Sequence, residues 1–94
     1  AIRSFHVDKI FTGTDGYSRE FGFTGEDLIR ADTLSAMIAS ANHTYVLADS
    51  AKFRQTGSVY FLKLEDVYQV ITDSNIDLDE KDYLERQGIH ITIA

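Results

Sequence analysis

The sequence contains no cysteine and no proline. The absence of cysteine excludes disulfides and zinc–thiolate sites, and it fits a reducing compartment. No proline marks a linker and no repeat divides the 94 residues, so we expect one domain, 1–94. No apolar run approaches the roughly 20 residues that a membrane-spanning helix needs. The first residues lack the apolar core of a secretory signal, so we expect a cytoplasmic protein with no membrane contact.

Basic residues are also few: 9 Lys and Arg stand against 15 Asp and Glu, for a formal net charge of −6. They are scattered and form no stripe, which argues against direct binding of nucleic acid by this chain. His6, His43 and His90 lie far apart and lack the spacing of a metal site. We therefore predict no metal and no cofactor.

One apolar run ends in residues that suit a phosphate. The predicted strand 45–48 is followed by Asp49, and Lys52 comes three residues later. In an α/β protein, ligands bind in the crevice outside the carboxyl ends of such strands. A lone lysine there acts on a phosphate as a point charge. The alternative is a solvated lysine in a surface turn.

A second run, 9–12, ends at Gly13-Thr14-Asp15-Gly16. Glycine at a strand end allows positive φ and lets the backbone approach a ligand closely. Asp-Gly is also a common pair in ordinary β-turns. Two such loops in one small chain leave a shared pocket and two plain turns as the alternatives.

The remaining pattern alternates strands and helices. We expect strands at 8–13, 45–48, 67–73 and 89–93, with 59–62 as an edge strand or a packed loop. A helix capped by Asp32 or Thr33 should bury Leu34, Met37, Ile38 and Ala41 and end at Asn42-His43. A second helix should open with an Asp77/Glu80 capping box and end near Gln87, before Gly88. Such alternation indicates an α/β fold with a mainly parallel, Rossmann-like sheet and flanking helices.

Two further segments carry expectations. Residues 14–31 read as a long polar connection, in which Tyr17, Phe21 and Phe23 would cover either a bound sugar or an oligomer interface. Ile2 and Phe5 have the spacing of the end of an amphipathic helix, as if the chain opened within an element.

Several motifs, in order, resemble those of the DeoR family of bacterial sugar-operon repressors. They are D-K-I-F-T-G-T-D-G at 8–16, E-F-G-F-T at 20–24, A-M-I at 36–38, V-L-A-D-S-A-K-F at 46–53, V-I-T-D at 70–73 and G-I-H-I at 88–91. The resemblance extends from about Asp8 to Ala94, nearly the whole chain. It implies the fold shared by DeoR sensor domains and ribose-5-phosphate isomerase, incomplete at the N-terminus.

By the same resemblance, the isomerases carry an A-D-x-S-K loop whose lysine contacts the substrate phosphate. Lys52 falls on that position, and Ala51 stands where the serine would be. The isomerases also carry D-G-A-D-E, but here Asp15-Gly16 continues with Tyr17 and Ser18, and no K-G-G-G loop follows. Isomerisation needs a base close to the reacting carbons. We therefore expect no catalytic residue and no enzyme activity.

The resemblance thus implies the effector-sensing portion of a repressor of a carbohydrate-utilisation operon, whose effector is a phosphorylated sugar. The predicted effector-binding residues are Lys52, Asp49, Gly13, Thr14, Asp15 and Gly16. DNA would be bound only through a helix-turn-helix that this chain lacks. We also expect a homo-oligomer, with contacts at Phe21, Phe23 and 59–62. The alternatives are an isomerase-like enzyme and a truncated fragment that oligomerises without a ligand.

Overall fold

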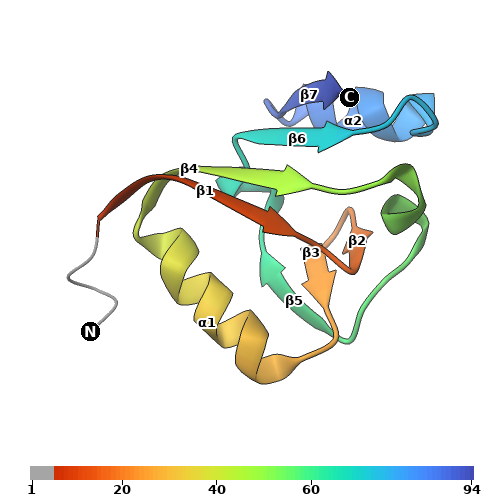
Figure 1. The fold of residues 1–94 in the computed structure, drawn as a ribbon. Coiled ribbons are helices and arrows are strands. Elements are labelled where there is room, and N and C mark those ends of the chain that lie inside the picture. Colours follow the sequence, from red (N-terminus) through yellow and green to blue (C-terminus); the bar gives the residue numbers. More distant parts are fainter. Residues whose placement is uncertain (1–5) are drawn as a thin grey trace.

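The computed structural model describes residues 6–94 and contains a larger parallel sheet and a smaller antiparallel one (Figure 1). The larger sheet has the order β1 (Val7–Gly13), β4 (Ala41–Leu47), β6 (Gln69–Thr72) and β7 (His90–Ile93). Every pair of neighbours in it is parallel. The expected α/β class with a mainly parallel sheet is confirmed. The helix end expected at Ile2 and Phe5 lies outside the described residues.

The smaller sheet lies largely within the stretch expected to be a polar connection. It consists of β2 (Gly16–Ser18), β3 (Gly22–Gly25) and β5 (Val59–Leu62), paired antiparallel. The β2–β3 hairpin turns where the Ser18 hydroxyl accepts the amides of Glu20 and Phe21, at 3.1 and 3.2 Å. The 59–62 run is therefore an edge strand, but it belongs to this second sheet.

Helix α1 (Leu28–Ala39) begins earlier than predicted. Its cap is Asp27, whose Oδ1 accepts the amides of Ile29 and Arg30 at 2.9 and 3.2 Å, so neither Asp32 nor Thr33 caps it. The earlier start makes Ala31 and Ile38 the buried positions of the helix, and Met37 is 40% exposed.

The end of α1 also differs from the prediction. The helix stops at Ala39, and Ala41, Asn42 and His43 already belong to β4. The strand is longer than the apolar run because β1 pairs with it from Val7 opposite Ala41 onward.

Helix α2 (Leu78–Arg86) lies where the sequence predicted it, and Gly88 follows it with φ of +87°. The predicted capping box is wrong, because the Asp77 side chain makes no capping hydrogen bond. The Glu80 carboxylate instead bonds to Tyr17 and Arg19. Two short 3-10 segments, η2 (Ser50–Arg54) and η3 (Leu64–Asp66), complete the fold.

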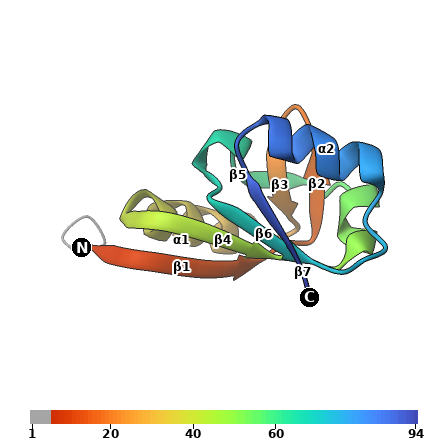
Figure 2. The same ribbon diagram turned by 90° about the horizontal axis from the view of Figure 1, so that it is seen from above.

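Both helices and the smaller sheet lie on the same face of the larger sheet (Figure 2). The core fills the space between these layers, with Phe23, Val46, Val70 and Leu84 fully buried. Tyr17 is also buried, so the expectation that Tyr17 and Phe23 cover a sugar or an interface is wrong; Phe21 is 48% exposed. No helix within residues 6–94 is long and apolar enough to span a membrane.

Candidate functional site

The two predicted loops leave the larger sheet at the same edge. β1 and β4 are parallel neighbours, and Gly13, the last residue of β1, lies opposite Leu47, the last of β4. The Gly13–Gly16 loop and the segment from Asp49 to Lys52 therefore start side by side. This is the arrangement that a shared ligand site requires.

A third strand end joins this edge, although its Asp73 is not one of the predicted effector-binding residues. The Asp73 carboxylate, just after β6, accepts the amides of Ser50 at 2.8 Å and Asn75 at 2.9 Å. The hydrogen bond from the Ser50 amide has the larger effect and that from the Asn75 amide the smaller; both hold the pKa of Asp73 below its ordinary value of 3.8. The signal was present in the sequence, because V-I-T-D at 70–73 ends in the same way as V-L-A-D at 46–49.

Lys52 lies in η2, and Asp49 is the N-cap residue just before this element. Asp49 is exposed, and its Oδ1 accepts the Ala51 amide at 3.1 Å. The Lys52 amide donates to the Asp49 carbonyl at 3.1 Å, and the Lys52 side chain is partly buried. Within residues 6–94 Lys52 forms no ion pair with a carboxylate. Asp49 thus shapes the turn that presents the Lys52 ammonium.

The four residues of the Gly13–Gly16 loop, called the glycine loop below, divide into two kinds. The Thr14 hydroxyl lies 2.7 Å from the Gly16 carbonyl oxygen and 3.0 Å from that of Thr24, so its proton is used within the loop. Gly16 is buried, and a Cβ there would lie 2.7 Å from the Gln55 carbonyl oxygen. These two residues hold the loop against its neighbours. Gly13 and Asp15 are the exposed members.

A pocket of about 380 Å³ adjoins the glycine loop on its α1 side. The start of α1 contributes Asp27 and Arg30 to it, and Lys52 is not among its lining residues. The full lining is Gly13, Thr14, Asp15, Gly25, Glu26, Asp27, Arg30, Ala31, Leu34 and Phe61. The structure therefore brings part of the predicted set to this pocket and leaves the predicted phosphate ligand outside it.

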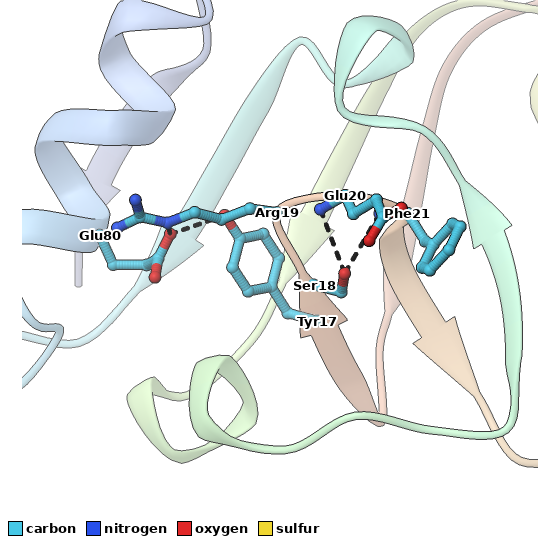
Figure 3. Close-up of polar contacts among 6 residues, drawn as sticks. All are labelled: Tyr17, Ser18, Arg19, Glu20, Phe21 and Glu80. Atoms are coloured by element: carbon cyan, nitrogen blue, oxygen red, sulfur yellow. Dashed lines mark hydrogen bonds and ion pairs between the residues drawn. The ribbon is translucent and has the colours of Figure 1, made fainter.

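Tyr17 follows the glycine loop and joins it to α2 (Figure 3). Its hydroxyl donates to Glu80 Oε2 at 2.7 Å, and Arg19 Nε donates to the same oxygen at 2.9 Å. Burial and the bond to the Glu80 carboxylate raise the pKa of Tyr17 far above its ordinary value. The Arg19 guanidinium also lies 4.3 Å from the centre of the Tyr83 ring. No local pattern in the sequence indicates this contact, because its partners are far apart in the chain.

The main chain of Tyr17 faces residues 53–56, which follow Lys52 and are called the lysine segment below. Its amide donates to the Gln55 carbonyl at 2.7 Å, and its carbonyl accepts from the Thr56 hydroxyl at 3.2 Å. Its ring packs against that of Phe53, the neighbour of Lys52, with 5.1 Å between ring centres. Tyr17 thus connects the glycine loop, the lysine segment and α2. Among residues 6–94, no group of three or more His, Cys, Asp and Glu side chains is placed to hold a metal ion.

Comparison with known proteins agrees with the motifs. A family described as the DeoR C-terminal sensor domain matches residues 1–74. The chain is 33% identical over 91 residues to the uncharacterized HTH-type transcriptional regulator FruR of Bacillus subtilis, a match that covers 97% of this chain and 36% of FruR. It is 29% identical over 86 residues to the HTH-type transcriptional regulator GlpR of Haloferax volcanii, covering 92% of this chain and 34% of GlpR.

The chain thus spans about a third of the length of these curated relatives. The resemblance found in the motifs is confirmed. The chain belongs to the DeoR C-terminal sensor domain family.

Proposed function

We propose that this chain is the C-terminal part of the effector-binding domain of a DeoR-type transcriptional repressor, and that its effector is a phosphorylated sugar. The family match and the names of the relatives support a regulator. The observation that carries the sugar-phosphate proposal is the meeting of the β1 and β4 ends at one edge. There Lys52, free of ion pairs within residues 6–94, shares the edge with the exposed Gly13 and Asp15.

Each residue has a distinct role in this proposal. The Lys52 ammonium binds the phosphate as a point charge. The Gly13 backbone and the Asp15 carboxylate contact the sugar hydroxyls. Asp49 and Asp73 fix the backbone of η2 through the Ala51 and Ser50 amides, so they orient Lys52 without touching the ligand. DNA is bound through a helix-turn-helix outside these 94 residues, in a homo-oligomeric repressor of a carbohydrate-utilisation operon.

We propose a sensor and not an isomerase because the residues at the positions of the isomerase acids have other roles. Ser18 and Arg19 stand where D-G-A-D-E has its second Asp and its Glu. The Ser18 hydroxyl accepts the amides of the hairpin turn, and the Arg19 guanidinium pairs with Glu80. Neither side chain is a base poised for proton transfer between adjacent carbons. A coupled isomerase assay on pentose and hexose phosphates should show no turnover above that of Lys52→Ala.

The test of sugar-phosphate binding is a calorimetric titration of a protein that contains this segment within a complete sensor domain. The ligands are a panel of sugar phosphates, each paired with its free sugar. Because hydrogen bonds to charged groups contribute on the order of 1.5–3 kcal/mol, Lys52→Ala should weaken binding of the sugar phosphate roughly ten- to a hundred-fold. The free sugar should lose far less.

Lys63→Ala is the matched control, because Lys63 is an exposed lysine that lies outside the strand-end edge. It should leave both affinities unchanged. Equal losses for the two ligands in Lys52→Ala would mean that Lys52 shapes the fold and does not contact the phosphate.

A further inference from the structure

β7 ends the larger sheet and pairs with β6 on one side only (Figure 1). The hydrogen bonds on the paired side show which groups lie on the free side. The His90 amide donates to the Tyr68 carbonyl at 3.2 Å, so it points toward β6. Successive residues of a strand point their amides and carbonyls to opposite sides, so those of Ile91 and Ile93 point away from β6. Within residues 6–94 these outward groups have no hydrogen-bonding partner.

The other strand edges of the described chain have some form of protection. The outer side of β2 is bonded, because the Tyr17 amide donates to the Gln55 carbonyl at 2.7 Å. α1 lies along β5, where the Ser35 hydroxyl donates to the Phe61 carbonyl at 3.0 Å. β1 carries two charged residues in a row, at 8–9. Proteins protect edge strands by such cover, or by charge, proline or a bulge. β7 reads H-I-T-I and has no charged residue and no proline.

Exposed aliphatic side chains accompany this open edge. Ile93 is 43% exposed, and Leu78, at the start of α2, is 77% exposed. Ile91 and Ile93 pair with Val70 and Thr72 of β6, which are buried, so both isoleucines lie on the side of the sheet that α2 covers. β-branched residues of this kind favour strands. The edge is therefore suited to pairing with a further strand.

The flank of α2 beside β7 carries balanced charge. Glu85 contributes to a hollow of about 510 Å³ that residues 88–92 also line, which places it on the β7 side of the helix. Lys81 pairs with Glu85 one helical turn away, at 3.3 Å. Glu80 and Tyr83 face the smaller sheet instead, through Tyr17 and Arg19. The chain has a formal net charge of −6, yet this flank presents one cation and one anion.

We propose that β7 pairs antiparallel with β7 of a second copy, so that the two larger sheets continue across a two-fold axis. This contact rests on the homo-oligomer of the proposed function and gives it a surface other than Phe21 and 59–62. Ile91 of each copy lies opposite Ile93 of the other, because these residues have both amide and carbonyl free. Each such pair exchanges two hydrogen bonds. Thr92 lies on the axis, opposite its equivalent.

The edge is complementary to itself in hydrogen bonding and in charge. A two-fold contact joins the same patch of both copies, so its donors must meet its own acceptors. Two outward amides and two outward carbonyls satisfy that condition. The axis also reverses the α2 helix of the second copy. The Lys81–Glu85 pair of one copy therefore runs opposite to that of the other, and unlike charges come nearest. Ile91, Ile93 and Leu78 supply the apolar contact beneath.

The first experiment is cysteine cross-linking in a protein of the relatives' length that contains this segment, which has no cysteine of its own. Residues on the axis form a non-hydrogen-bonded pair with Cα atoms about 4.5 Å apart, within the range of a disulfide. Thr92→Cys should therefore form an intermolecular disulfide on mild oxidation, identified by mass spectrometry of the linked peptides. Tyr60→Cys is the matched control, because Tyr60 is 60% exposed and lies on the surface at 59–62. It should cross-link at least about ten-fold more slowly, since only paired cysteines have a high effective concentration.

The second experiment measures the dissociation constant of the same protein by sedimentation. Ile93→Pro removes an outward amide and no bond to β6, and proline is tolerated on the free side of an edge strand. Ile93→Val keeps the amide and nearly the same volume. Proline should raise the dissociation constant at least about ten-fold, because two amides per dimer are lost. Valine should raise it by less than about three-fold.

Equal cross-linking of Thr92→Cys and Tyr60→Cys, or equal dissociation constants for Ile93→Pro and Ile93→Val, would overturn the proposal. Faster cross-linking of Tyr60→Cys would do the same and would identify the surface at 59–62 as the contact. A protein that stays monomeric in sedimentation would refute the homo-oligomer as well. No sugar phosphate enters either experiment, so these outcomes leave the role of Lys52 untouched.

Discussion

The Tyr17→Phe substitution should destabilise the fold while keeping its packing. The lost hydroxyl donates to Glu80 Oε2 at 2.7 Å, with Tyr17 4% exposed and the Glu80 side chain 15% exposed. Phenylalanine keeps the ring contacts with Phe23 and Phe53, so the change isolates one hydrogen bond. Hydrogen bonds to charged groups contribute about 1.5–3 kcal/mol. Arg19 still bonds to the carboxylate in the variant, so we expect a loss near the lower end of that range.

The assay is urea unfolding with linear extrapolation, arranged as a double-mutant cycle between Tyr17→Phe and Glu80→Ala. The reference is a second cycle between Lys81→Ala and Glu85→Ala, an exposed pair one helical turn apart at 3.3 Å. Exposed pairs of this kind couple by about 0.3–0.5 kcal/mol. The denaturant slope should stay constant, because the surface exposed on unfolding is the same in each variant.

The prediction is tested by comparing the coupling free energies of the two pairs. A Tyr17–Glu80 coupling no larger than that of Lys81–Glu85 would refute the reasoning that burial strengthens the bond between the hairpin and α2.

Two further substitutions test the strand-end loops. Gly16→Ala should cost about 1–3 kcal/mol of unfolding free energy through overpacking, since its Cβ would lie 2.7 Å from the Gln55 carbonyl oxygen. Gly13→Ala should cost under about 0.5 kcal/mol, because its Cβ would lie 3.9 Å from the Leu47 carbonyl oxygen, an ordinary contact. Similar losses for the two variants in urea unfolding would contradict this account. The lowered folded pKa of Asp73 means that its stabilisation is present above the ordinary value of 3.8 and is lost as pH falls through the folded pKa. Unfolding midpoints measured down to about pH 2 should therefore fall more steeply for the wild type than for Asp73→Asn, and parallel curves would speak against the assignment.

The strand ends were predictable because their signal is local. Each long apolar run stops at a polar residue, and parallel strands bring those ends to one edge whatever their order. The start of α1 was not predictable, because Asp27 and Asp32 both precede apolar residues at helical spacing. What favours the earlier cap is the burial of Ala31 and Ile38 against the sheets, which is a tertiary effect.

The hairpin and its contact with α2 depend on distant partners. β2 and β3 are too short to be recognised alone, and β3 is completed by β5, far along the chain. Glu80 has the local spacing of a capping box, but its carboxylate instead accepts a hydrogen bond from the buried Tyr17 hydroxyl. The pairing of loops was therefore accessible from the sequence, and the side-chain contacts that hold them were not.

The order of strands has a consequence for how the chain is made. In the larger sheet, β4, β6 and β7 each pair with the strand of that sheet that precedes them in the sequence. During synthesis, the partner of each of these strands is therefore already available when the strand leaves the ribosome. In the smaller sheet the interval is longer, because α1, β4 and η2 are all synthesised between β3 and β5. Until β5 arrives, β3 presents an open edge to any other strand in the cell. Translation speed between α1 and β5 thus sets how long the nascent protein is exposed to mispairing.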